Sequence, residues 1–429
     1  MTRNCAYFVA YIPISRHLNA LRGFWILLTN FLHSKNYRTH LAPFPRILQF
    51  ASFPVLCQFL FTLMAILVMR GLLSRKELSV KRTKCWPTLI LLLVLICLTG
   101  ATSEAAPRRV IIDTDPGVDD AMAILLALNS PELKVEALTV VAGNVDAAQG
   151  LENALKIVSL AQRCDVVVAG GAQHPLNQKL ITAQFWHGKN GLAGVQLPAS
   201  KCKADSRFGP DLIIELAHKY PHDLTLIPVG PLTNIALAVS KDPSIASLVR
   251  DIVVMGGSVS GGNVNGAAEA NIYNDPEAAQ IVFNAGWMVT MIGSDVGERT
   301  LMTRKYLTEL RANHGPQSDF VAKLADFYLT RSEKSGYSGA AMYDPLAVGA
   351  VIDPTLVTLK AMHVDVETRG EFTRGETVAN RMGSNENNVL HGDHYEIEGV
   401  IELKLNARVC LASDADRFLN LFFSRIRGK

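Results

Sequence analysis

The segment Asp113-Thr114-Asp115-Pro116-Gly117-Val118-Asp119-Asp120 places four carboxylates within eight residues. An apolar run, 110–112, comes directly before it, and a longer apolar run, 121–126, comes directly after it. The first run predicts a buried strand and the second a helix, with Pro116-Gly117 as the turn between them. We therefore expect Asp113 and Asp115 at the carboxyl end of a strand, and Asp119 and Asp120 at the start of a helix.

Four carboxylates crowded at the end of a strand repel one another unless a bound group neutralises them. Ca²⁺ and Mg²⁺ prefer carboxylate oxygens, and ligands of open α/β sheets bind beyond the carboxyl ends of the strands. One or two of the four could instead cap the first turn of the helix, but capping does not account for all four. The segment therefore predicts a divalent metal ion and the place of an active site.

Short apolar runs alternate with helical patterns through the rest of the chain after residue 105. The expected strands are 109–113, 135–141, 165–169, 223–229, 251–255 and 288–294, with a final strand at 397–405. The expected helices include 119–128, 147–162, 209–219, 232–240, 276–285 and 317–332. This alternation predicts an α/β fold with an open, mostly parallel central sheet and helices on both faces. Turn-forming residues in 368–393 predict an exposed loop.

The first hundred residues have a different character. Residues 50–68 form an apolar run long enough for a transmembrane helix. A second run, 86–98, follows a basic segment and precedes small residues, as in a secretory signal peptide. We therefore divide the chain into an apolar leader or transmembrane segment (1–68), a signal peptide or signal anchor (69–104) and a folded domain (105–429). Because Met69 precedes the basic segment, residues 1–68 could also reflect an alternative start or a gene-model extension.

Either interpretation of the leader places the domain in a lumen or outside the cell, either secreted or membrane-anchored by its N-terminal segment. Membrane contact is expected only through that leader. The first hundred residues hold 12 basic residues and one acid, which leaves 30 basic and 38 acidic residues, a net charge of −8. An acidic domain without a basic block excludes a nucleic-acid partner. Cys164 and Cys202 could pair in an oxidising compartment, but their spacing does not decide it.

The segment 113–128 resembles the N-terminal signature of the inosine-uridine type nucleoside hydrolases. Further matching motifs follow in the order of that family, and nothing before residue 105 resembles it: Val141-Ala142-Gly143-Asn144, Pro228-Val229-Gly230-Pro231-Leu232-Thr233-Asn234, Val254-Met255-Gly256-Gly257, Asn263, 269–278 and Asp344-Pro345-Leu346-Ala347. The resemblance implies a Rossmann-like nucleoside hydrolase fold. It also implies hydrolysis of the N-glycosidic bond of purine or pyrimidine ribonucleosides, a step of purine nucleoside catabolism. Members are commonly homodimers or homotetramers.

The resemblance also implies a role for each matching residue. A Ca²⁺ ion would be held by three carboxylates and one backbone carbonyl: Asp115, Asp120, Asp344 and the carbonyl of Val229. The ion would lower the pKa of a bound water, and Asp115 would remove the proton as general base. Amide and carboxylate side chains suit the vicinal hydroxyls of ribose, which would be bound by Asp119, Asn144, Asn263, Glu269 and Asn271.

One position departs from the pattern of the family. Well-studied members carry a histidine directly before the last metal-binding Asp, where it is thought to protonate the leaving base, but this chain has Tyr343. A phenol with an unperturbed pKa near 10 is a weaker acid than histidinium. We therefore expect Tyr343 to alter base preference or rate without abolishing hydrolysis. His187 matches a family histidine near the base and could supply the proton instead, while Trp186 could stack on the base.

Two other functions compete with this interpretation. A non-catalytic nucleoside- or ribose-binding homologue would explain the missing histidine, but simple binding does not require a base beside a metal site. A phosphatase of the haloacid-dehalogenase type also begins with Asp-x-Asp at a strand end, and it would use Asp113 as the nucleophile with Mg²⁺. The continuation Pro116-Gly117-Val118-Asp119-Asp120 and the later Asn and Glu motifs fit a phosphatase poorly.

Overall fold

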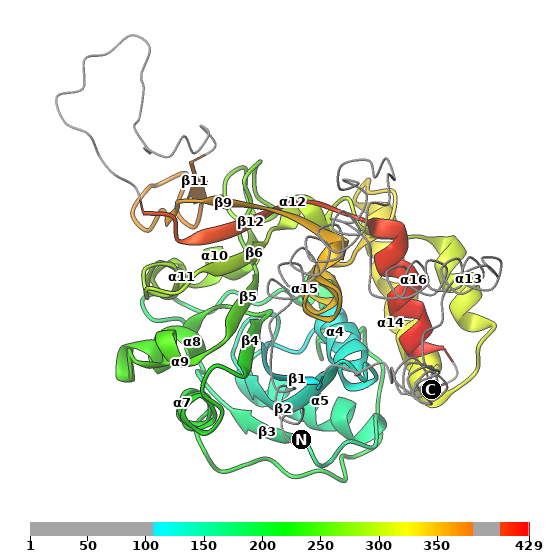
Figure 1. Cartoon of the computed structure of the whole chain (residues 1–429). Helices are drawn as coiled ribbons and strands as arrows, with labels where there is room; N and C mark the ends of the chain where they lie inside the picture. The colour runs from blue at the N-terminus through cyan, green and yellow to red at the C-terminus, as the bar shows by residue number, and fades with distance from the viewer. Residues whose placement is uncertain (1–105, 381–403, 428) are drawn as a thin grey trace, which may run out of the picture. The chain divides into compact units, whose positions relative to one another are not determined.

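The computed structural model describes residues 106–380, 404–427 and 429 (Figure 1), all within the compact unit Ala105–Lys429. The leader and signal-peptide predictions, 1–68 and 69–104, lie outside the described residues. Within the described ranges, no helix combines the length and the apolar character that crossing a bilayer requires.

An eight-stranded sheet forms the centre of the domain, with the strand order β3-β2-β1-β4-β5-β6-β12-β9. The first seven strands run parallel and β9 pairs antiparallel with β12 at the edge, which confirms an open, mostly parallel sheet. The strand bounds are β1 (Arg108–Thr114), β2 (Leu133–Val140), β3 (Val167–Gly170), β4 (Leu224–Pro228), β5 (Asp251–Met255), β6 (Val289–Ile292), β9 (Val357–Met362) and β12 (Ala407–Ser413).

Helices cover both faces of this sheet (Figure 1). In β1, Val110 and Ile112 belong to one apolar core while Ile111 belongs to the other, because successive side chains of a strand point to opposite faces. The first core packs against α4 (Val118–Leu128), α5 (Ala147–Leu160), α14 (Pro316–Lys334), α15 (Tyr343–Ile352) and α16 (Ala415–Ile426). The second packs against α7 (Gly209–Lys219), α8 (Thr233–Lys241) and α11 (Pro276–Phe283).

Two details of the C-terminal part differ from the sequence prediction. The expected strand 397–405 is wrong in position: residues 404–406 lie outside strands, and β12 begins at Ala407. Apolar residues alternate without a break from 401 to 411, so the sequence pattern does not say which part pairs with β6. The stretch 368–393 also contains β11 (Thr377–Ala379), which pairs antiparallel with β10 (Val364–Val366). Strands of three residues are too short to produce a recognisable alternation.

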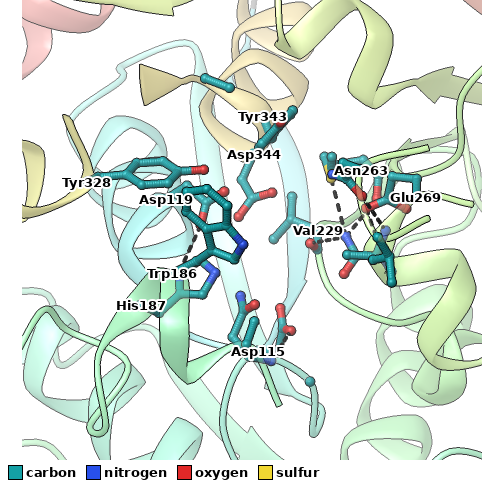
Figure 2. Close-up of a pocket in the computed structure, with 18 of the residues that line it drawn as sticks. Asp115, Asp119, Trp186, His187, Val229, Asn263, Glu269, Tyr328, Tyr343 and Asp344 are labelled. Atoms are coloured by element: carbon teal, nitrogen blue, oxygen red, sulfur yellow. Dashed lines mark hydrogen bonds and ion pairs between the residues drawn. The ribbon is translucent and has the colours of Figure 1, made fainter. Parts of the chain in front are cut away.

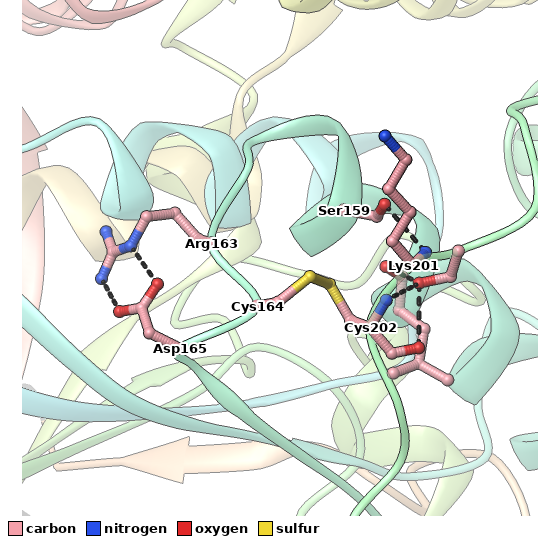
Figure 3. The surroundings of a disulfide bond; sticks show 8 residues. Ser159, Arg163, Cys164, Asp165, Lys201 and Cys202 are labelled. Atoms are coloured by element: carbon pink, nitrogen blue, oxygen red, sulfur yellow. Dashed lines mark hydrogen bonds and ion pairs between the residues drawn. A yellow bond between two sulfur atoms is a disulfide. The ribbon is translucent and has the colours of Figure 1, made fainter.

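A disulfide joins Cys164 and Cys202, whose Cα atoms are 5.1 Å apart (Figure 3). It connects the segment after α5 to the segment before α7. Beside it, the backbone N–H of Lys201 donates to Ser159 Oγ at 3.1 Å. Neither cysteine lines the large cavity described below.

We expect the double variant Cys164→Ser/Cys202→Ser to lower the free energy of unfolding by about 2–4 kcal/mol, because opening a loop of this length frees the unfolded chain. Its activity below the unfolding transition should remain close to that of the parent enzyme. Chemical denaturation of both proteins measures the difference. Equal stability in the two proteins would contradict a structural role for the disulfide.

Candidate active site

The predicted site residues converge at the carboxyl ends of the central parallel strands. They surround a cavity of about 370 Å³ (Figure 2). Asp115, Asp119, His187, Val229, Tyr343 and Asp344 line it, as do the four other predicted ribose-binding residues, Asn144, Asn263, Glu269 and Asn271. Asp120 is fully buried and does not appear on the cavity wall. The fold therefore gathers the distant motifs into one place, as the resemblance implied.

Asp120 organises the turn between β1 and α4. Its Oδ1 accepts hydrogen bonds from Thr114 Oγ1 at 2.6 Å and from the backbone N–H of Asp115 at 3.2 Å. Its Oδ2 accepts from the backbone N–H of Gly117 at 2.9 Å and from Asn144 Nδ2 at 2.9 Å. The Pro116-Gly117 turn is thus folded around this carboxylate. Asn144 contributes to the same network, so a position that could have been a simple turn residue has a defined contact at the site.

Asp115 lies against two glycine backbones at the cavity. A Cβ on Gly143 would come within 1.9 Å of Asp115 Oδ2, and a Cβ on Gly230 within 2.7 Å of Oδ1. Oδ2 accepts from the backbone N–H of Asn144 at 2.6 Å, whereas the buried Oδ1 has no hydrogen-bond partner. Burial and the charge of Asp120 raise the pKa of Asp115 well above its usual range. A carboxylate with one free oxygen and a raised pKa suits a general base.

Three carboxylates converge closely enough to share a cation. One oxygen from each of Asp119, Asp120 and Asp344 lies within 4.8 Å of the others, and all three residues are buried. Burial and neighbouring acids raise the pKa of Asp119 to about 8 and that of Asp344 well above its usual range. The Oδ1 of Asp119 is buried without a hydrogen-bond partner. Such a donor set of hard oxygens with uncompensated charge fits a divalent metal ion. Asp115 lies beside this cluster but is not one of its three members.

The opposite wall of the cavity comes from the segment that includes α10 (Ala270–Asn274). Glu269 caps this helix by accepting from the backbone N–H groups of Asn271 and Ile272, and it also accepts from Gly257 N–H at 3.0 Å. Asn271 Nδ2 donates to the carbonyls of Val229 at 2.8 Å and Met255 at 3.1 Å. These contacts fix the amide of Asn271 and aim it at the predicted carbonyl ligand of Val229.

His187 belongs to the short helix α6 (Gln184–His187). Its Nδ1 accepts from the backbone N–H of Val118 at 3.1 Å, which places the proton of the neutral ring on Nε2. Burial lowers the pKa of His187 to about 4. At neutral pH it is therefore a hydrogen-bond donor through Nε2 rather than a charged acid. This geometry favours Tyr343 over His187 as the source of the proton.

Aromatic side chains border the cavity on the side of His187 and Tyr343. Trp186 makes edge contacts with Tyr328 and Tyr337, with ring centroids 6.5 and 6.4 Å apart. Tyr328 and Tyr337 were not expected from the sequence, because neither belongs to a recognisable motif. Figure 2 shows Trp186 and Tyr328 near Asp119, with Tyr343 above Asp344. Flat aromatic faces of this kind suit a purine or pyrimidine base.

Asp113 is not part of the cavity wall. Its Oδ1 accepts from Thr139 Oγ1 at 2.6 Å and from Asn234 Nδ2 at 2.7 Å, and the residue is almost completely buried. A nucleophile for phosphate would have to reach the substrate, so the phosphatase alternative does not fit this structure. Asp275 is also structural, since it caps α11 through the backbone N–H of Ala278 at 3.1 Å. Asp344 makes no such capping bond in α15.

The fold and the site together define a hydrolase built around a buried carboxylate cluster on an open parallel sheet. The family model for the inosine-uridine preferring nucleoside hydrolases matches residues 110–420. The chain belongs to this family and is an enzyme that cleaves the N-glycosidic bond of ribonucleosides.

Two characterised relatives show how much of the chain is shared. The inosine-uridine preferring nucleoside hydrolase of Crithidia fasciculata is 41% identical over 276 residues, covering 64% of this chain and 88% of the relative. The pyrimidine-specific ribonucleoside hydrolase RihA of Salmonella arizonae is 38% identical over 320 residues, covering 74% and 98%.

Solved structures give the same result. A plant nucleoside hydrolase has 34% identity and a TM-score of 0.69, and the match covers 75% of this chain and 100% of that one. The purine-preferring ribonucleoside hydrolase of Gardnerella vaginalis has 38% identity and a TM-score of 0.67, covering 74% and 98%.

Proposed function

We propose that this enzyme hydrolyses ribonucleosides with a Ca²⁺ ion held by Asp115, Asp120, Asp344 and the backbone carbonyl of Val229. The supporting observation is the cluster of buried carboxylates at the cavity, where Asp115 Oδ1 and Asp119 Oδ1 lack hydrogen-bond partners. Oxygen-only ligands favour Ca²⁺ or Mg²⁺ over softer metals. When bound, the cation neutralises these carboxylates and lowers the pKa of a water molecule.

The residues of the chain divide the remaining work. Asp115 takes a proton from the attacking water on its free Oδ1, and the water oxygen bonds to C1′ of the ribose. The electron pair of the breaking C1′–N bond goes to the base, which receives a proton from Tyr343 Oη. Asp119, Asn144, Asn263, Glu269 and Asn271 hold the ribose hydroxyls. Trp186 stacks on the base, and His187 donates a hydrogen bond through Nε2.

We propose purine and pyrimidine ribonucleosides as the substrate class, with a place in purine nucleoside catabolism. Similar enzymes are named for inosine and uridine, for pyrimidines and for purines, so the family covers both kinds of base. The Cys164–Cys202 disulfide supports a secreted or lumenal enzyme, because such bonds persist in oxidising compartments. We also propose a homo-oligomer, a dimer or tetramer, as is common in the family.

The ribose contacts predict strong discrimination against deoxynucleosides. Removing the 2′-hydroxyl leaves buried polar groups without partners, and such sites reject the analogue by roughly 10⁴-fold in kcat/KM. Release of reducing sugar from inosine and 2′-deoxyinosine measures this ratio. Comparable rates on both would contradict the assigned ribose contacts. Binding of both nucleosides without any turnover would instead support the non-catalytic homologue.

A further inference from the structure

Glu298 is a charged side chain on the cavity wall to which the mechanism above gives no role. It is half-buried and directly follows the short helix α12 (Ser294–Gly297), at the carboxyl side of β6. No sequence motif pointed to it. Its neighbours in the cavity include Tyr343, the residue that replaces the family histidine.

The fold holds Glu298 and Tyr343 together by packing and by backbone hydrogen bonds. The ring of Tyr343 lies directly on Gly297, where a Cβ would come within 2.2 Å of Tyr343 Cδ1. The strand β7 (Leu301–Met302) pairs with β8 (Ala340–Ala341), and the backbone N–H of Met342 donates to the carbonyl of Thr300 at 3.0 Å. The two segments on either side of the pair are therefore joined, and neither residue can move far from the other.

Charge makes Tyr343 a poor acid when it acts alone. Burial, followed by the charge of Glu298, raises the pKa of the Tyr343 phenol, although the interaction with Asn263 lowers it. Losing its proton would leave a buried phenolate beside an acidic side chain. The groups that face Glu298 are Asp295 of its own helix and Tyr343 of α15. Burial and Asp295 raise the pKa of Glu298, and the hydrogen bond from Tyr343 lowers it.

We propose that Glu298 acts through Tyr343 as the proton source of a two-residue relay, an inference that rests on the proton-donor role proposed for Tyr343. As the C1′–N bond breaks, Tyr343 Oη gives its proton to the leaving nitrogen and takes one from the carboxylic acid of Glu298. Tyrosine stays neutral throughout and glutamate becomes a carboxylate. Glu298 then regains a proton from solvent, while Asp115 releases the one it took from water. Glu298 thus orients and reprotonates Tyr343 without touching the substrate.

Leaving groups of different basicity test the relay in the metal-loaded full-length enzyme. Inosine and uridine need a proton on the departing base, whereas 4-nitrophenyl riboside releases a stable nitrophenolate unaided. General acid catalysis contributes roughly 10²-fold or more, so Tyr343→Phe should lower kcat on the nucleosides by about 10²-fold. Glu298→Gln, which keeps shape but holds no acidic proton, should lower it by about 10-fold. Both variants should keep near-normal rates on the nitrophenyl riboside.

Two further readouts separate the relay from a structural role. The double variant should be no slower on nucleosides than Tyr343→Phe alone, since both changes remove one relay. The fall in nucleoside turnover toward alkaline pH, expected when Glu298 is deprotonated, should be absent in Glu298→Gln. The exposed Glu371→Gln is the matched control and should behave as the parent enzyme.

Each other outcome overturns the proposal in a distinguishable way. Equal losses on nucleosides and nitrophenyl riboside would make Glu298 merely structural. Normal nucleoside rates in Glu298→Gln, with Tyr343→Phe impaired, would remove Glu298 and keep Tyr343 as the donor. Normal rates in Tyr343→Phe would reject the donor role on which the relay depends.

Discussion

Replacing Asp115 with asparagine is expected to lower kcat on ribonucleosides by about 10³-fold or more. The amide has nearly the same shape as the carboxylate, but it cannot accept the proton of the attacking water. General base catalysis alone contributes roughly 10²–10⁴-fold, and the proposed metal site would lose one anionic ligand as well. Steady-state kinetics on inosine and uridine with the purified variant measure the loss.

Asp113→Asn is the matched control for this prediction, because Asp113 lies in the same strand only two residues away. Its Oδ1 accepts from Thr139 and Asn234 and its Oδ2 has no hydrogen-bond partner, so an amide fits the same place. Burial raises the pKa of Asp113 to about 7, which brings its neutral form close to that of asparagine. We expect kcat within a few-fold of the parent. Matching losses in both variants would show that the strand end is merely sensitive to substitution.

The contrast between Asp113 and Asp115 also shows what local sequence can predict. The apolar run, the Pro-Gly turn and the following helical run placed all four carboxylates at a strand end, and β1 and α4 have these positions. Alternation along the strand sends neighbouring side chains to different surroundings, but it does not say which of the four reaches the cavity. That division depends on partners such as Asn234, which is 121 residues away from Asp113.

Residues brought to the cavity by tertiary structure were beyond sequence reasoning. Glu298 approaches Tyr343 because two strands of only two residues pair, a feature without a sequence signal. Tyr328 lies on α14, whose helical pattern was predicted correctly, but its direction depends on how that helix packs against α4. The tautomer of His187 depends on the N–H of Val118, 69 residues earlier. The ordered motifs therefore predicted the site, and the contacts between motifs explain its chemistry.

Removal of the metal ion is expected to abolish turnover and to make stability strongly dependent on pH. Without a cation, burial and neighbouring acids raise the pKa of Asp119 to about 8 and burial raises that of Glu269 to about 7. An acid whose pKa is higher in the folded state than in the unfolded state binds more protons when folded, so stability falls as pH rises. The fall should run from about pH 4, the unfolded value, to about pH 8.

Thermal unfolding of the chelated enzyme between pH 5 and pH 8.5 measures this effect, beside the same protein with excess Ca²⁺ or Mg²⁺. We expect Tm to decrease with pH after chelation, and the added cation to restore both Tm and turnover, because a ligand that binds only the folded state stabilises it. The variant Asp120→Asn should show a smaller decrease in Tm, since it removes one of the charges that raise the pKa of Asp119. A Tm that ignores both chelator and cation, with full turnover after chelation, would contradict a metal ion at this cluster.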